Sequence, residues 1–114
     1  MAGPGGGLRF TGSFTTDGSG NATVDMVIPA RADGRVRRVL RAIIGNAVAP
    51  TLTGGTAVLK DNAGAGQTIL TFTQATDGTK KELDAPVGTI VGNLRITVAG
   101  GGASKVGQYH VELS

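Results

Sequence analysis

The chain has 114 residues, enough for one domain, and a net charge of only +3, which is weak for a general nucleic-acid binder. Without cysteine it has no disulfides, thiolate chemistry or cysteine-based zinc sites, and no apolar run is long enough to span a membrane. Twenty Gly and fourteen Thr favour tight turns and β-branched strand faces, so we expect a β-rich fold.

The first seven residues, MAGPGGG, have no side chain able to join a core. We therefore expect a flexible Gly-rich N-terminal arm over residues 1–7 and a single folded domain over residues 8–114. A glycine backbone can approach another chain closely, so we expect the arm to bind a neighbouring subunit. The arm residues assigned to this interface are Gly3, Pro4, Gly5, Gly6 and Gly7. The segment lacks the features of a secretory signal, so we expect synthesis in the cytoplasm.

Two alternating runs follow the arm. Apolar and polar residues alternate over residues 8–15 and again over residues 22–28, and the turn Asp17–Gly20 lies between them. A period of two indicates strands, and two such runs around a Gly-rich turn are typical of an antiparallel hairpin. Pro29 ends the second run because proline cannot donate to a strand ladder.

Residues 36–44 fit two templates. Their apolar positions match the i, i+3, i+4, i+7 spacing of an amphipathic helix, but part of the segment also alternates as a strand does. Four of its apolar residues are β-branched, and the flanking sequence is β-like, which favours a strand.

Further strands are indicated over residues 56–60, 68–73, 94–98 and 109–113, separated by loops rich in Gly, Asn and Asp. Seven or eight short strands between turn signals indicate an all-β sandwich or barrel.

Candidate chemical sites are weak. The single histidine, His110, alternates with apolar neighbours and has no nearby carboxylate pair, so an exposed strand position explains it. Four oxygen-bearing residues loosely resemble a calcium-binding loop, but Ile28 occupies the position of its bidentate Glu and Ala22 the position of its Gly. A turn therefore explains these four residues better than a calcium site does. Those residues are Asp17, Ser19, Asn21 and Asp25. We expect no catalytic, cofactor or metal site, and therefore no enzyme.

Five arginines within eleven residues form the most distinctive feature of the chain. They are Arg31, Arg35, Arg37, Arg38 and Arg41. The cluster is consistent with a solvated face, with pairing to an acidic protein surface, or with nucleic acid. The low net charge and the shortage of aromatic side chains disfavour nucleic acid. Arginine suits bidentate pairing with carboxylates, so we predict a protein interface.

Three segments carry a resemblance to the small β-sandwich structural proteins of tailed bacteriophages. They are Arg35–Leu40, Gly55–Asp61, in which a Thr/Val strand ends in Lys-Asp, and Gly92–Gly102, in which Leu-Arg-Ile-Thr-Val runs into a Gly turn. The similarity spans residues 34–114, and within that group the chain is similar to capsid decoration (cement) proteins. It implies a jelly-roll-like antiparallel β-sandwich and a homotrimer that binds the major capsid protein on the capsid surface of the virion. The family has no catalytic residues.

Two alternatives remain open. One is another virion component, such as a head fibre base or a tail protein. The other is a carbohydrate-binding β-sandwich, which the scarcity of aromatic rings disfavours. The aromatic residues of the chain are Phe10, Phe14, Phe72 and Tyr109. No cofactor or membrane partner is expected.

Overall fold

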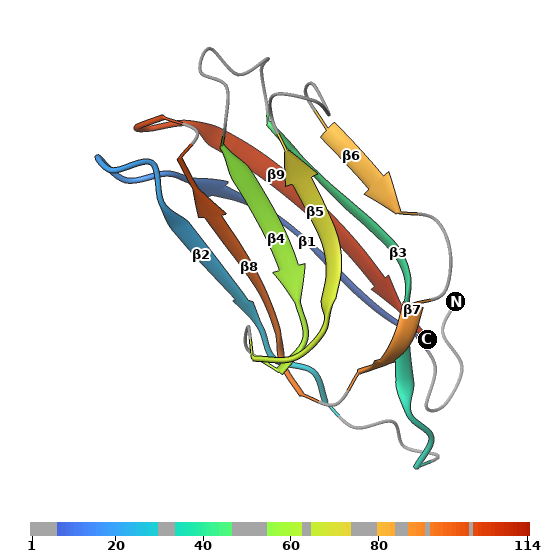
Figure 1. The fold of residues 1–114 in the computed structure, drawn as a ribbon. Helices are drawn as coiled ribbons and strands as arrows, with labels where there is room; N and C mark the ends of the chain where they lie inside the picture. The colour runs from blue at the N-terminus through green and yellow to red at the C-terminus, as the bar shows by residue number, and fades with distance from the viewer. Residues whose placement is uncertain are drawn as a thin grey trace.

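The computed structural model describes residues 7–29, 34–46, 55–62, 65–73, 80–83, 87–90, 92–100 and 102–114. Within these ranges the chain forms strands and no α-helix (Figure 1). The strands are β1 (Leu8–Thr15), β2 (Ala22–Met26), β3 (Arg37–Asn46), β4 (Thr56–Lys60), β5 (Thr68–Thr73), β6 (Lys80–Leu83), β7 (Val87–Ile90), β8 (Leu94–Ala99) and β9 (Val106–Leu113). The described ranges accordingly hold no helix long and apolar enough to cross a membrane.

The strands form two antiparallel sheets packed face to face. One sheet has the order β1-β9-β3-β6, and the other has the order β2-β8-β4-β5. β7 also pairs with β3, at residues 37–39, whereas β6 pairs with residues 42–45 of the same strand. The two short strands therefore lie one after the other along the same edge of β3. β4 and β5 form a hairpin within the second sheet, and the connections β1–β2, β2–β3, β3–β4, β5–β6, β7–β8 and β8–β9 cross between the sheets in the manner of a jelly roll. The prediction of an all-β jelly-roll-like sandwich is confirmed.

The core lies between the sheets and is filled by the inward side of each alternating strand. In β4 and β8 every second residue is buried, as a strand with one face in the core requires. Burying each large aliphatic or aromatic side chain contributes roughly 1.5–3 kcal/mol. The buried apolar residues are Phe14, Met26, Val39, Ala42, Ile44, Ala57, Leu59, Ile69, Leu70, Phe72, Ile90, Leu94, Ile96, Val98, Val111 and Leu113.

The predicted hairpin between the first two strands is wrong. β1 pairs with β9 and β2 pairs with β8, so the intervening turn carries the chain from one sheet to the other. The turn itself forms as expected: Asp17 accepts hydrogen bonds from the backbone N–H groups of Ser19 and Asn21. Buried Thr16 fixes the crossing, because its hydroxyl donates to the Gly102 carbonyl at 2.6 Å and accepts from the Lys105 N–H at 2.7 Å.

The ambiguous segment is a strand, as predicted, and it contains a β-bulge. In the pairing of β3 with β9 the register shifts between Val39 and Arg41, where Leu40 is the extra residue. Before the bulge, Val39 is buried; after it, Ala42 and Ile44 are buried. The shift changes the parity of the inward positions, so that Val39 and Ala42, three residues apart, both face the core.

Candidate functional site

The start of β3 presents a row of side chains to solvent. Val36 and Leu40 are 59% and 40% exposed, and the exposed Arg38 lies between them on the same side of the strand. No ion pair joins the Arg38 guanidinium to a carboxylate within the described ranges. We call Val36, Arg38 and Leu40 the β3 surface. It combines an exposed cation with two exposed aliphatic side chains.

Arg37 lies on the opposite side of the strand and is buried, with 7% of its surface exposed. Its Nε donates to the Pro29 carbonyl at 2.7 Å, and its Nη1 donates to the Ser114 carbonyl at 2.8 Å. Arg37 therefore does not belong to a solvated face, one of the possibilities left open for the cluster, because strand alternation turns it inward. Its guanidinium therefore links Pro29, after β2, and Ser114, after β9, to the start of β3 by hydrogen bonds.

The other arginines are placed differently again. Arg41 follows the bulge and forms an ion pair with Glu82 of β6, with Nη2 at 2.6 Å from Oε1. Arg35 is exposed directly before β3. Arg31 lies outside the described residues, as do Gly3, Pro4, Gly5 and Gly6 of the arm. The members of the predicted cluster thus have separate roles, and Arg35 and Arg38 carry the interface prediction within the described chain.

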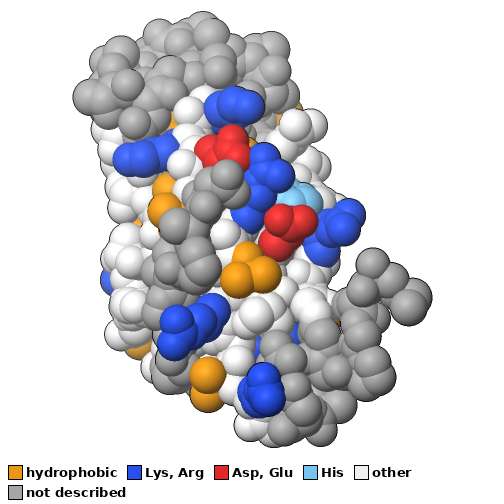
Figure 2. All heavy atoms as spheres, turned by 90° about the vertical axis from the view of Figure 1, so that its right-hand side faces the viewer, with side chains coloured by type: hydrophobic (Ala, Val, Ile, Leu, Met, Phe, Trp, Pro, Cys, Tyr) orange, Lys and Arg blue, Asp and Glu red, His pale blue; other side chains and the backbone are white. Residues whose placement is uncertain are grey.

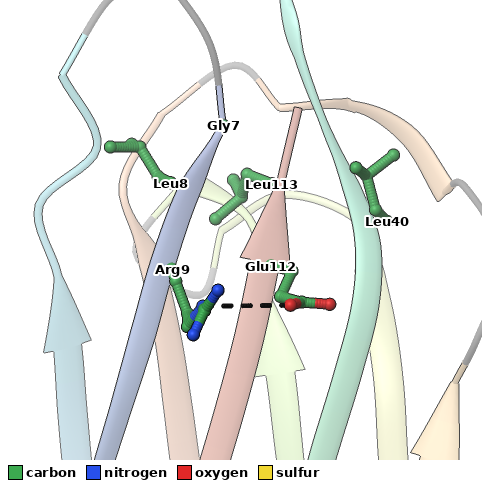
Figure 3. A pocket seen from close by; sticks show the side chains of 6 residues that line it. All are labelled: Gly7, Leu8, Arg9, Leu40, Glu112 and Leu113. Carbon is green, nitrogen blue, oxygen red and sulfur yellow. Dashed lines mark ion pairs between the residues drawn. The ribbon is translucent and has the colours of Figure 1, made fainter. Parts of the chain in front are cut away.

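A pocket of about 290 Å³ adjoins the β3 surface. Figure 3 shows Arg9 of β1 facing Glu112 of β9, with the ion pair at 3.9 Å, and Leu40 standing on β3 at the other side of β9. Gly7 closes one rim, where a Cβ would lie only 2.7 Å from the Leu113 carbonyl oxygen, so this close approach requires glycine. The structure thus brings the last arm residue and the β3 surface to one hollow.

The charges on this side of the molecule are mixed. Figure 2 shows Lys and Arg side chains around acidic side chains and the single histidine. His110 Nε2 lies 3.4 Å from Glu112 Oε1, and Arg9 approaches the same carboxylate. Glu112 is therefore surrounded by basic groups of its own chain, whereas Arg38 is a cation that an acidic partner can reach.

The calcium-like residues do not converge. The Asp17 carboxylate accepts backbone N–H groups of Asn21 and Ser19, and these hydrogen bonds lower its pKa from the ordinary 3.8. Asp25 instead pairs with Arg95 across the sheet, with Oδ1 at 2.6 Å from Nε, and this hydrogen bond raises the pKa of Arg95. In the described part of the chain no group of three or more His, Cys, Asp or Glu side chains is placed to hold a metal ion.

The sequence analysis did not identify Val36 and Leu40 as parts of this surface, because it counted them only among the apolar positions that fit a helix or a strand. The available signal was their alternation with Arg37 and Val39. If Val39 faces the core, then Val36, Arg38 and Leu40 must face outward in a regular strand.

Comparisons with known proteins give a fold likeness alone. No protein-family model matches the chain, and no curated protein matches it. A solved structure described as "Bacillus endospore appendages form a novel family of disulfide-linked pili" is similar, with a TM-score of 0.47 and 14% identity over 94% of this chain and 83% of that one. A likeness at this level carries no argument about function.

Proposed function

We propose that this chain is a non-catalytic structural module that binds the outer surface of a protein shell, in the manner of a capsid decoration protein on its major capsid protein. The observation that carries the proposal is the β3 surface, where Arg38, which forms no ion pair with the residues that the structure describes, lies between two exposed aliphatic side chains. An acidic patch with an apolar centre on the partner would complement this row.

The energetics suit docking rather than catalysis. Burying the exposed parts of Val36 and Leu40 against a partner would contribute up to about 1–2 kcal/mol each, given roughly 25 cal/mol per Å² of apolar surface. A bidentate bond from Arg38 to a carboxylate adds geometric specificity. Binding that bridges adjacent shell subunits stabilises the shell, because the bridging contacts must break before the subunits separate.

The expected setting is the capsid surface of a virion, with the chain made in the host cytoplasm and assembled as a homotrimer. The described Gly7 supports a contribution from the N-terminal arm, because it lies at the rim of the pocket that Leu40 also lines. An arm that leaves the domain at this hollow is positioned to reach the same partner as the β3 surface. Deleting residues 2–7 should therefore weaken shell binding with little change in melting temperature.

The test begins with the cells whose genome encodes this chain. Phage production is induced, particles are separated on a density gradient, and an antibody against the purified protein locates it. We expect it in the particle fraction. Its presence only at the top of the gradient, as free protein, would contradict the proposal.

A variant then tests the surface. Particles stripped of the protein are mixed with the wild type or with the Arg38→Ser/Leu40→Ser variant, and bound protein is measured by co-sedimentation. Losing two central contacts should weaken binding about tenfold or more. The control, Arg95→Ser/Val58→Ser, likewise replaces an arginine and an aliphatic residue with serine on the outer face of the other sheet, and it should bind as the wild type does. Equal losses for both variants would exclude the β3 surface as the docking site.

A further inference from the structure

β1 forms an open edge of the first sheet. It is bonded to β9 on one side, and no described strand pairs with its other side. Its register with β9 runs unbroken from Leu8 opposite Leu113 to Thr15 opposite Val106. Residues 11–13 at its centre are all exposed, so nothing covers the middle of the edge.

The outward backbone groups of β1 belong to its odd-numbered residues. Thr16, next to the strand, donates its N–H to Lys105 and accepts from Ser104, so its backbone faces the β9 side. On the far side of β9, the N–H of Ser114 donates to Arg38 of β3, so even-numbered residues of β9 face β3 and odd-numbered ones face β1. Alternation in an antiparallel ladder then turns the N–H and C=O groups of Arg9, Thr11, Ser13 and Thr15 away from the domain.

This edge lacks the devices that the edge strands β6, β2 and β5 have. β6 carries Lys80, Lys81 and Glu82 in a four-residue strand. β2 has only five residues and includes Asp25, and β5 has a register shift in its pairing with β4. β1 has eight residues, no proline and no register shift, and Arg9 is its one charge. Long regular edges without such protection are templates for strand pairing.

We propose that β1 pairs antiparallel with β1 of a second copy, about a two-fold axis at Gly12. In this register Thr11 faces Ser13 of the other copy, and Arg9 faces Thr15. Every outward N–H and C=O of the odd-numbered residues gains a partner, because residues of the same parity meet. The two Arg9 side chains lie at opposite ends of the contact, so no like charges meet across it.

The strand suits its own copy because its outward groups are self-complementary under a two-fold, the commonest symmetry of soluble oligomers. The inference goes beyond shell binding and holds whether or not the chain binds a shell. The contact joins two chains, or two trimers, into one particle with a continuous sheet. Its loss should therefore halve the particle mass.

A charge-swap experiment tests both the contact and its register. The acidic variant is Thr11→Glu/Ser13→Glu, and the basic variant is Thr11→Lys/Ser13→Lys. Each alone should have half the wild-type mass in light scattering after size exclusion, because like charges face each other across the axis. A 1:1 mixture should restore the full mass, since Glu then faces Lys at each pair. The control, Thr23→Glu/Thr68→Glu, adds the same charge to exposed positions of the other sheet and should keep the full mass.

A backbone variant separates pairing from side-chain effects. Ser13→Pro removes an outward N–H and no bond to β9, so it should halve the mass while circular dichroism stays β-dominated. Ser13→Ala keeps the N–H and should behave as the wild type does. The proposal is overturned by any of three results: a single-chain mass for the wild type at all soluble concentrations, full mass in the proline variant, or a mixture of acidic and basic variants that stays at half mass.

Discussion

Replacing Arg37 with Met should destabilise the fold far more than the same change one residue later. Met keeps much of the apolar stem of Arg37 but removes the guanidinium donors, and among the described residues the carbonyls of Pro29 and Ser114 lose their hydrogen bonds. Arg38 is exposed, and only its backbone bonds to Ser114, so Arg38→Met leaves those hydrogen bonds in place. The two substitutions therefore compare the inward and outward sides of one strand with identical chemistry.

The magnitude follows from the two lost bonds. A hydrogen bond from a charged donor contributes about 1.5–3 kcal/mol, and the lower end applies here because water can reach carbonyls near the surface. The free energy of unfolding should thus fall by about 3 kcal/mol in Arg37→Met, against about 0.5 kcal/mol or less in Arg38→Met. For a domain of this size, the loss in Arg37→Met corresponds to a fall in melting temperature of about 10 °C.

Urea denaturation followed by circular dichroism measures both variants, with the unfolding slope checked for constancy. Arg37→Lys adds a graded point: a lysine keeps the charge but cannot present two fixed donors, so it should recover only part of the loss. Equal stabilities of Arg37→Met and Arg38→Met would refute the reasoning, because they would show that the buried bonds contribute nothing net.

Two further predictions concern single positions. Gly107→Ala should lower the free energy of unfolding by about 1–3 kcal/mol, because the Phe14 ring lies against Gly107. Gly18 faces open space, so Gly18→Ala should change it by about 0.5 kcal/mol or less. Denaturant midpoints measure both variants, and similar midpoints would contradict this packing of Phe14 on Gly107. The lowered pKa of Asp17 stabilises the fold above its ordinary pKa of 3.8, and this contribution disappears as pH falls through the lowered folded-state value. The melting-temperature gap between wild type and Asp17→Ala should therefore shrink on acidification below 3.8; a constant gap would show that the carboxylate's charge is irrelevant.

Strand positions were predictable from the sequence because alternation is a local signal. Strand partners were not, because the turn at Asp17–Gly20 suits a hairpin and a crossing between sheets equally well. What decides between them is Thr16, whose hydroxyl bonds to Gly102 and Lys105 near the other end of the chain. Such a contact joins segments far apart in the sequence, so the local spacing of apolar and polar residues cannot predict it.

The arginine cluster shows a second limit. Counting charges between residues 31 and 41 treats its members alike, whereas alternation separates Arg37 from Arg38. The bulge at Leu40 then turns Arg41 outward to Glu82, where a regular strand would have turned it into the core. One inserted residue reverses the parity of all later positions, and a bulge has no residue signature of its own.

The two proposed contacts use different parts of one sheet. β9 separates the β1 edge from β3, so pairing at β1 leaves Arg38 and Leu40 uncovered. A two-fold that pairs antiparallel edge strands runs perpendicular to the sheet, so the outer faces of both copies point the same way. A pair of chains would thus present two β3 surfaces in one direction, and a shell with repeated subunits would bind both together. Each weak site would then strengthen the other through effective concentration, so that a small surface centred on Arg38 would suffice to hold a small domain on a large particle, if the proposed function is right.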